Sequence, residues 1–194
     1  MIALIPVGKS RRLKDKHFLH INEKRMIDYI VDKIMDCNFF DDIVVISYKE
    51  IEIKNAVLII DNDLLGVSNA MKQAMEKFDN DVFLIGGDMP FVSCESISML
   101  FGYPGSLISI PRWSTGYFEP LHAFYPRSIT FPERKDMKSL LEKNMFVSVR
   151  AESFPEYTFF NINTKEDYIT AVKLLENPFV YGELKSQNLN LVKN

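Results

Sequence analysis

Residues 1–18 read MIALIPVGKSRRLKDKHF, and this stretch joins a short apolar run directly to a cluster of basic residues. The apolar run, residues 2–7, has no strict alternation, which favours a strand buried on both faces of a sheet. Five lysine and arginine residues then lie between positions 9 and 16. A loop that follows a first strand and carries backbone amides and cations is suited to di- and triphosphates. The alternative is a solvated basic loop.

The remaining apolar runs extend this pattern into an alternation of strands and helices. Residues 42–47, 56–60, 81–87 and 106–110 favour further buried strands, whereas 26–35 and the segment after Gly66 repeat apolar residues at helical spacing. Later segments predict strands at 119–126 and 147–152 and helices at 137–144 and 165–177. This order predicts a three-layer α/β/α sandwich with a mostly parallel sheet, whose ligand site lies at the carboxyl ends of the strands.

Length and composition limit the classes of protein to consider. At 194 residues with 47% hydrophobic content, we expect a single domain over residues 1–177 and a loosely ordered tail over 178–194. The formal net charge of −3 argues against a general nucleic-acid binder. No signal peptide or membrane span is predicted, so we expect a cytoplasmic protein. Cys37 and Cys94 have no C-x-x-C neighbour and are predicted to be reduced, mostly buried thiols.

Acidic and amide side chains follow several of the predicted strands. Asp88 follows the strand in DVFLIGGDMPFVS (81–93), where it is placed either to hold Mg²⁺ between phosphate oxygens or to close a simple turn. Asp61 ends another strand before Gly66 opens a helix, and it is either a nucleotide contact or a turn residue. Asn163 is either a metal ligand or a helix cap.

Three segments, in combination with the basic loop, resemble the molybdenum cofactor guanylyltransferases. They are GDMPF (87–91), PLHAFY (120–125) and NINTKED (161–167), and the resemblance spans residues 2–175. It implies a Rossmann-like sheet of the nucleotide-diphospho-sugar transferase type. It also implies transfer of GMP from GTP to the terminal phosphate of molybdopterin, release of pyrophosphate, Mg²⁺ as cofactor, and contact with molybdoenzyme maturation proteins.

The same resemblance assigns roles to individual residues. It implies that Lys16 neutralises the triphosphate and that Asp88 binds Mg²⁺, with Asn163 as a second metal ligand and Arg12 as a further catalytic cation; Asp15 matches the acidic residue that precedes the family's lysine. Glu119 and His122 would face the pterin substrate. The implied nucleotide-binding residues are Ile5, Pro6, Val7, Gly8, Lys16, Asp61, Gly66 and Asp88.

The first loop departs from the family pattern, because Pro6-Val7 replaces Ala-Gly and the segment between Leu13 and Asp15 is shortened. Val67 also stands where the family has proline. Two alternatives therefore stay open. One is a related nucleotidyltransferase that uses CTP or another phosphorylated acceptor, and the other is a non-catalytic homologue that binds the nucleotide or the pterin.

Overall fold

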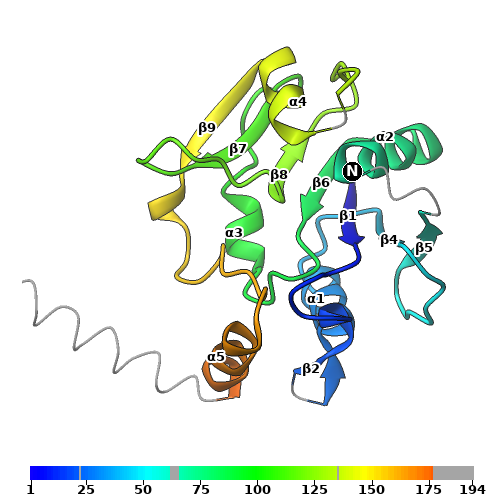
Figure 1. Cartoon of the computed structure of the whole chain (residues 1–194). Helices are drawn as coiled ribbons and strands as arrows, with labels where there is room; N and C mark the ends of the chain where they lie inside the picture. The colour runs from blue at the N-terminus through cyan, green and yellow to red at the C-terminus, as the bar shows by residue number, and fades with distance from the viewer. Residues whose placement is uncertain (22, 62–65, 135, 177–194) are drawn as a thin grey trace, which may run out of the picture.

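A seven-stranded sheet forms the centre of the computed structural model, which describes residues 1–21, 23–61, 66–134 and 136–176 (Figure 1). Its strand order is β5-β4-β1-β6-β8-β7-β9. The strands are β1 (Ile2–Val7), β4 (Asp42–Ser47), β5 (Val57–Ile60), β6 (Val82–Ile85), β7 (Ile108–Arg112), β8 (His122–Tyr125) and β9 (Phe146–Arg150). β8 runs antiparallel to both of its neighbours, whereas the other pairings are parallel. The predicted mostly parallel sheet is confirmed.

Helices cover both faces of this sheet and complete the predicted three layers (Figure 1). On one face lie α1 (Met26–Met35), α3 (Cys94–Ser98) and α5 (Lys165–Glu176), and on the other lie α2 (Val67–Phe78) and α4 (Met137–Lys143). Alternate residues of β1 enter the two cores: Ala3 and Ile5 join the first, and Ile2 and Leu4 join the second. Both faces of β1 are therefore buried, which explains why its sequence shows no polar alternation.

β1 and β6 diverge at the point where the chain order of the sheet reverses. Pairing of β1 with β6 ends at Leu4, whereas pairing with β4 continues to Val7 opposite Ser47. Pro6, which has no N–H to donate, lies at this divergence. Open α/β sheets bind ligands in the crevice at such a switch point. The strand order thus locates the crevice directly beside the basic loop.

Several short elements are absent from the sequence expectations. The chain adds a 3-10 turn at Lys16–Phe18, a small hairpin of β2 (His20–Ile21) and β3 (Lys24–Arg25), a second 3-10 turn at Ala151–Ser153, and α3. Each is too short to leave a periodic pattern.

At the start of α5, Thr164 Oγ1 accepts from the Asp167 N–H at 3.1 Å, and the Asp167 carboxylate accepts from the Thr164 N–H at 2.8 Å. This reciprocal pair is a capping box.

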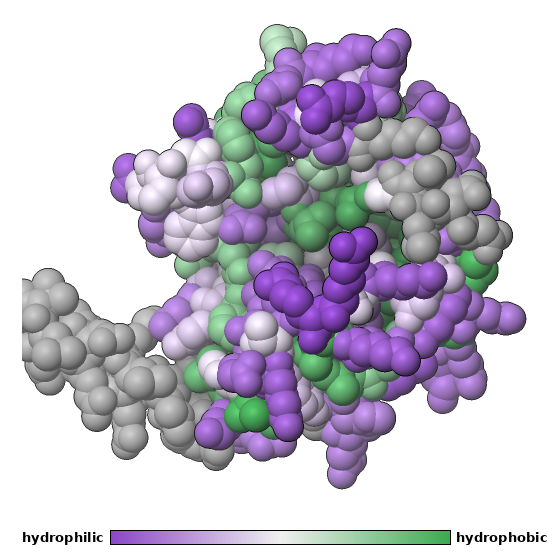
Figure 2. Space-filling model, in the orientation of Figure 1, coloured by the Kyte–Doolittle hydropathy of each residue, from purple (hydrophilic) through white to green (hydrophobic). Residues whose placement is uncertain are grey.

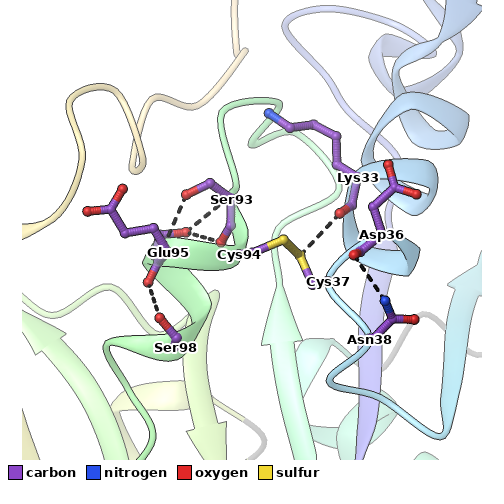
Figure 3. Close-up of a disulfide and its surroundings, with 9 residues drawn as sticks. Lys33, Asp36, Cys37, Asn38, Ser93, Cys94, Glu95 and Ser98 are labelled. Carbon is purple, nitrogen blue, oxygen red and sulfur yellow. Dashed lines mark hydrogen bonds between the residues drawn. A yellow bond between two sulfur atoms is a disulfide. The ribbon is translucent and has the colours of Figure 1, made fainter.

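The two cysteines form a disulfide, so the prediction of reduced thiols is wrong. Figure 3 shows the bridge between Cys37, just after α1, and Cys94, the first residue of α3. The two residues are 57 positions apart, and their Cα atoms lie 5.2 Å apart. The absence of a C-x-x-C pattern carried no information here, because packing of α1 and α3 on one sheet face brings the cysteines together.

No helix in the described ranges is both long and apolar enough to cross a membrane. The predicted tail, residues 178–194, lies outside the described residues.

Candidate active site

A cleft of about 780 Å³ opens at the carboxyl ends of β1, β4 and β6. Its volume falls within the range of roughly 300–1,000 Å³ common for small-molecule sites. Figure 2 shows hydrophilic side chains projecting in front of this hollow, with hydrophobic surface behind them. Among the residues with an implied role, the cleft wall contains Pro6, Val7, Gly8, Arg12, Lys16, Asp61, Gly66, Asp88 and Asn163.

The Lys16 ammonium joins two oxygen ligands that come from distant parts of the chain. Its Nζ donates to Asp88 Oδ2 at 2.5 Å and to Asn163 Oδ1 at 3.0 Å. The side chains of Lys16 and Asp88 are only 8% and 15% exposed, so water screens this ion pair little. Asn163 reaches the pair because the adjacent Ile162 N–H donates to the Asp88 carbonyl at 3.0 Å. A buried cation, a carboxylate and an amide oxygen thus meet at one point.

Two close contacts at Gly87 hold the Asp88 loop against the first loop. A Cβ placed on Gly87 would lie 2.8 Å from the Pro6 carbonyl oxygen, so only glycine permits this approach. The Gly87 carbonyl accepts from His17 Nδ1 at 2.8 Å, which places the ring proton on that nitrogen. Burial lowers the pKa of His17 and favours its neutral form. His17 is therefore a neutral donor that links the two loops directly behind Lys16.

The donor set of this site suits a magnesium ion. Mg²⁺ prefers oxygen ligands and is commonly held by one or two carboxylates with water and substrate phosphates. Asp88 and Asn163 supply two such oxygens, and the Lys16 ammonium already shows that a cation is stable between them. Within the described residues, no group of three or more His, Cys, Asp or Glu side chains forms a cage for a metal. The remaining ligands would then be phosphate and water oxygens.

The other walls of the cleft separate into a cationic part and a mixed apolar part. Lys9, Arg11 and Arg12 are exposed on the loop after β1, where their charges face the opening. The rest of this wall includes Ile46, Tyr48, Asp61, Gly66, Val67 and Ala70, and the Lys9 ammonium lies 5.6 Å from the centroid of the Tyr48 ring. Gly66 has a φ of 90°, a conformation that favours glycine, and it directly precedes α2. This part offers apolar contact for a base next to the N-terminus of α2.

Three residues with implied roles lie outside the cleft wall. Ile5 is fully buried within β1. Glu119 is partly buried and accepts from Trp113 Nε1 at 2.6 Å, and burial raises the pKa of its carboxyl group. His122 is 0% exposed and packs against Phe83, Phe154 and Phe159. The structure therefore gives Ile5 and His122 no surface through which to touch a substrate.

His122 makes the stability of this fold depend on pH. Burial lowers its pKa from 6.5 to about 4, so between these values the unfolded chain binds a proton that the folded chain does not. The contribution of His122 to the stability of the fold is therefore fully present above pH 6.5. It decreases by about 3 kcal/mol as the pH falls toward 4. Urea unfolding across this window checks the prediction. The free energy of unfolding should change less with pH in His122→Phe than in the parent. An equal change with pH in both proteins would contradict the prediction.

The structure also brings residues to the cleft that the sequence reasoning did not assign. Ile46 lies near the end of β4, Tyr48 directly follows that strand, and His17 follows Lys16. The rule that ligands gather at the carboxyl ends of parallel strands points to Tyr48, since it directly follows a predicted strand. For His17, proximity to Gly87 has no signal in the sequence.

Comparisons with known proteins agree with this architecture. Residues 7–151 match the MobA-like NTP transferase domain. A probable molybdenum cofactor guanylyltransferase of Pyrococcus furiosus is 32% identical over 186 residues, which cover 85% of this chain and 92% of that protein.

Solved structures with the same fold were also found. The molybdopterin-guanine dinucleotide biosynthesis protein A of Archaeoglobus fulgidus superposes with a TM-score of 0.74 at 24% identity, over 91% of this chain and all of the other. A CMP:2-keto-3-deoxy-manno-octonic acid synthetase complexed with CTP gives a TM-score of 0.70 at 14% identity, over 91% of this chain and 98% of the other. With a domain match across most of its length and a relative at this identity, the chain belongs to the MobA-like NTP transferase family, the nucleotidyltransferases that include the molybdenum cofactor guanylyltransferases.

Proposed function

We propose that this protein transfers GMP from GTP to the terminal phosphate of molybdopterin, with Mg²⁺ as cofactor and release of pyrophosphate. The observation that carries the proposal is the meeting of Lys16, Asp88 and Asn163 in a cleft beneath a cationic loop. Nucleotidyl transfer requires alignment and neutralisation of charge rather than a protein nucleophile. Family membership and the curated relatives support the choice of GTP and molybdopterin.

The reaction exchanges one bond at phosphorus for another. An oxygen of the molybdopterin phosphate attacks the α-phosphorus of GTP, and the bond from that phosphorus to the bridging oxygen of the β-phosphate breaks. The electron pair leaves with pyrophosphate. Lys16 neutralises the α-phosphate region, and Arg12 attracts the departing pyrophosphate. Bound to Asp88 and Asn163, Mg²⁺ would supply Lewis-acid stabilisation of the phosphate oxygens.

We place the nucleotide between β1 and α2 and the acceptor on the side of the β7–β8 loop. Pro6, Val7 and Gly8 line the first part, together with Asp61 and Gly66. The acceptor side includes Leu121 in the cleft wall and, beyond it, the hydrogen-bonded pair of Trp113 and Glu119. An aromatic ring beside a carboxyl group suits a flat, polar pterin. Docking of molybdoenzyme maturation proteins stays a prediction from the resemblance.

Isothermal titration with GTP and with CTP, each with and without Mg²⁺, tests the nucleotide part of this proposal. We expect Mg²⁺-dependent binding of GTP that is weakened at least about tenfold in Asp88→Asn, because the variant lacks a charged ligand for the ion. Glu142→Gln removes an exposed carboxylate on α4 that does not line the cleft, and it is the matched control.

The outcomes separate the proposal from its two alternatives. Preference for CTP would identify a cytidylyltransferase and contradict the choice of base. Binding of GTP that neither Mg²⁺ nor Asp88→Asn alters would remove the metal from the account. If GTP binds in the titration but a separate incubation with GTP, Mg²⁺ and molybdopterin gives no transfer of GMP, the non-catalytic homologue would be favoured.

A further inference from the structure

The residue before Lys16 is tied to the loop after β4. Asp15 Oδ1 accepts from the Tyr48 hydroxyl at 2.6 Å and from Lys49 Nζ at 3.0 Å. These hydrogen bonds lower the pKa of the Asp15 carboxyl group, the contribution of Tyr48 being the largest. We call the three side chains of Asp15, Tyr48 and Lys49 the clasp. It joins the two loops that follow the adjacent strands β1 and β4.

The backbone of Asp15 is itself held in an unusual conformation. Its φ of 53° lies in the left-handed region, which aspartate and asparagine tolerate better than most residues. Asp15 immediately precedes the 3-10 turn that carries Lys16. The Lys49 ammonium also lies 4.3 Å from the centroid of the Phe18 ring, at the other end of that turn. The clasp therefore contacts the chain on both sides of Lys16.

The contacts of Lys16 must change when the substrate binds, whereas those of the clasp need not. Without substrate, the Lys16 ammonium is held by Asp88 and Asn163. Under the proposed function, Asp88 and Asn163 would hold the metal with these two oxygens, and the Lys16 ammonium would face phosphate. The side-chain contacts that fix Lys16 in the free protein would then be lost. The backbone of Lys16 is still fixed by the contacts of its two neighbours. His17 bonds to the Gly87 carbonyl, and Asp15 bonds to the other members of the clasp.

We propose that Asp15, through its bonds to Tyr48 and Lys49, is a positioning residue that keeps Lys16 aligned with the triphosphate after its ammonium has left Asp88. This inference rests on the proposed function. Asp15 and Lys49 are each 41% exposed, so the clasp contributes little to the stability of the fold. Its contribution is geometric, and small misplacements of a charged group near a reacting phosphate slow the reaction strongly.

Simple electrostatics predicts the opposite effect for the same substitution. Asp15 is an acidic residue within the basic loop, and removal of its charge would by itself increase the attraction of the loop for GTP. Under that view Asp15→Asn binds GTP more tightly and reacts at least as fast. If Asp15 is a positioning residue, Asp15→Asn reacts more slowly. The direction of the change in kcat therefore distinguishes the two.

The experiment measures kcat, the KM for GTP and the melting temperature in four variants and the parent. Asp15→Asn keeps the left-handed conformation accessible but removes the charge, and Tyr48→Phe removes only the hydroxyl. The third variant combines both changes. Glu50→Gln removes an exposed carboxylate beside Lys49 that is outside the clasp, so it is the matched control for charge.

We expect kcat to fall about tenfold or more in Asp15→Asn and less in Tyr48→Phe, with the KM for GTP within about threefold of the parent. Asparagine keeps an oxygen that accepts from Tyr48 but lacks the charge, so it weakens the contact that Tyr48→Phe removes. The loss in the double variant should therefore be smaller than the product of the two single losses. Melting temperatures and the kinetics of Glu50→Gln should stay at the parent values. Provided that the parent is active, an unchanged or higher kcat in Asp15→Asn would overturn the inference. Losses of kcat that multiply in the double variant would overturn it as well. An inactive parent would overturn the proposed function and this inference with it.

Discussion

Replacing Lys16 by methionine is expected to slow GMP transfer by about 10²–10³, since loss of one well-placed charge contact in such a site costs about 2–4 kcal/mol of transition-state stabilisation. Lys16 is the cation at which Asp88 and Asn163 converge, and its side chain is 8% exposed. Methionine keeps the length of the side chain but not its charge. Steady-state kinetics with GTP and molybdopterin measure the effect.

Lys14→Met is the matched control, because Lys14 lies in the same loop, is exposed and does not line the cleft. It should retain the activity of the parent. Removal of Lys16 also leaves Asp88 as an unpaired, largely buried carboxylate, which destabilises the fold. The double variant Lys16→Met/Asp88→Asn removes both charges and separates this effect from catalysis: we expect it to recover stability but not activity. Turnover of Lys16→Met within about threefold of the parent would contradict the assigned role.

Loss of the disulfide is expected to lower the free energy of unfolding by about 2–4 kcal/mol, because the unfolded chain is released from a closed loop. Cys37 and Cys94 are 57 positions apart, and both are partly exposed, so a small dithiol can reach the bridge. Urea unfolding of Cys37→Ser/Cys94→Ser, measured without reductant, checks this prediction.

Reduction of the parent protein provides an internal control for this prediction. The parent treated with a dithiol should unfold at the same urea concentration as the double serine variant, and the reductant should leave that variant unchanged. If the parent without reductant had the same urea midpoint as the double serine variant, the bridge would add no stability. Because Cys94 lies six positions after Asp88, the bridge also ties the segment that follows Asp88 to α1.

The longer elements of the fold follow from the sequence because their burial is simple. β1 and β4 occupy residues 2–7 and 42–47, as the apolar runs predict, and α1 occupies 26–35. These segments are buried on both faces or along one helical stripe, and such patterns are legible in the residues. α3 has five residues and begins at a capping box formed by Ser93, which precedes the helix, and Ser96 within it. This pattern is too local to distinguish a helix from a turn.

The position of each candidate residue relative to the cleft was less accessible from the sequence. Asp88 and Asp61 follow strands, so the rule for parallel sheets places both at the ligand edge, and the structure has both in the cleft wall. His122 lies in a strand buried on both faces, and no pattern in such a strand tells which neighbours a side chain meets. The pairing of Asp15 with Tyr48, and of Cys37 with Cys94, depends on how distant segments pack.

Incubation of the purified protein with molybdopterin, Mg²⁺ and GTP labelled at the α-phosphate tests the central claim most directly. We expect the label to move to molybdopterin, pyrophosphate to be released in equal amount, and neither product to form without the acceptor. CTP in place of GTP should give little or no transfer. Label that stays in GTP, or transfer from CTP in preference to GTP, would contradict the account.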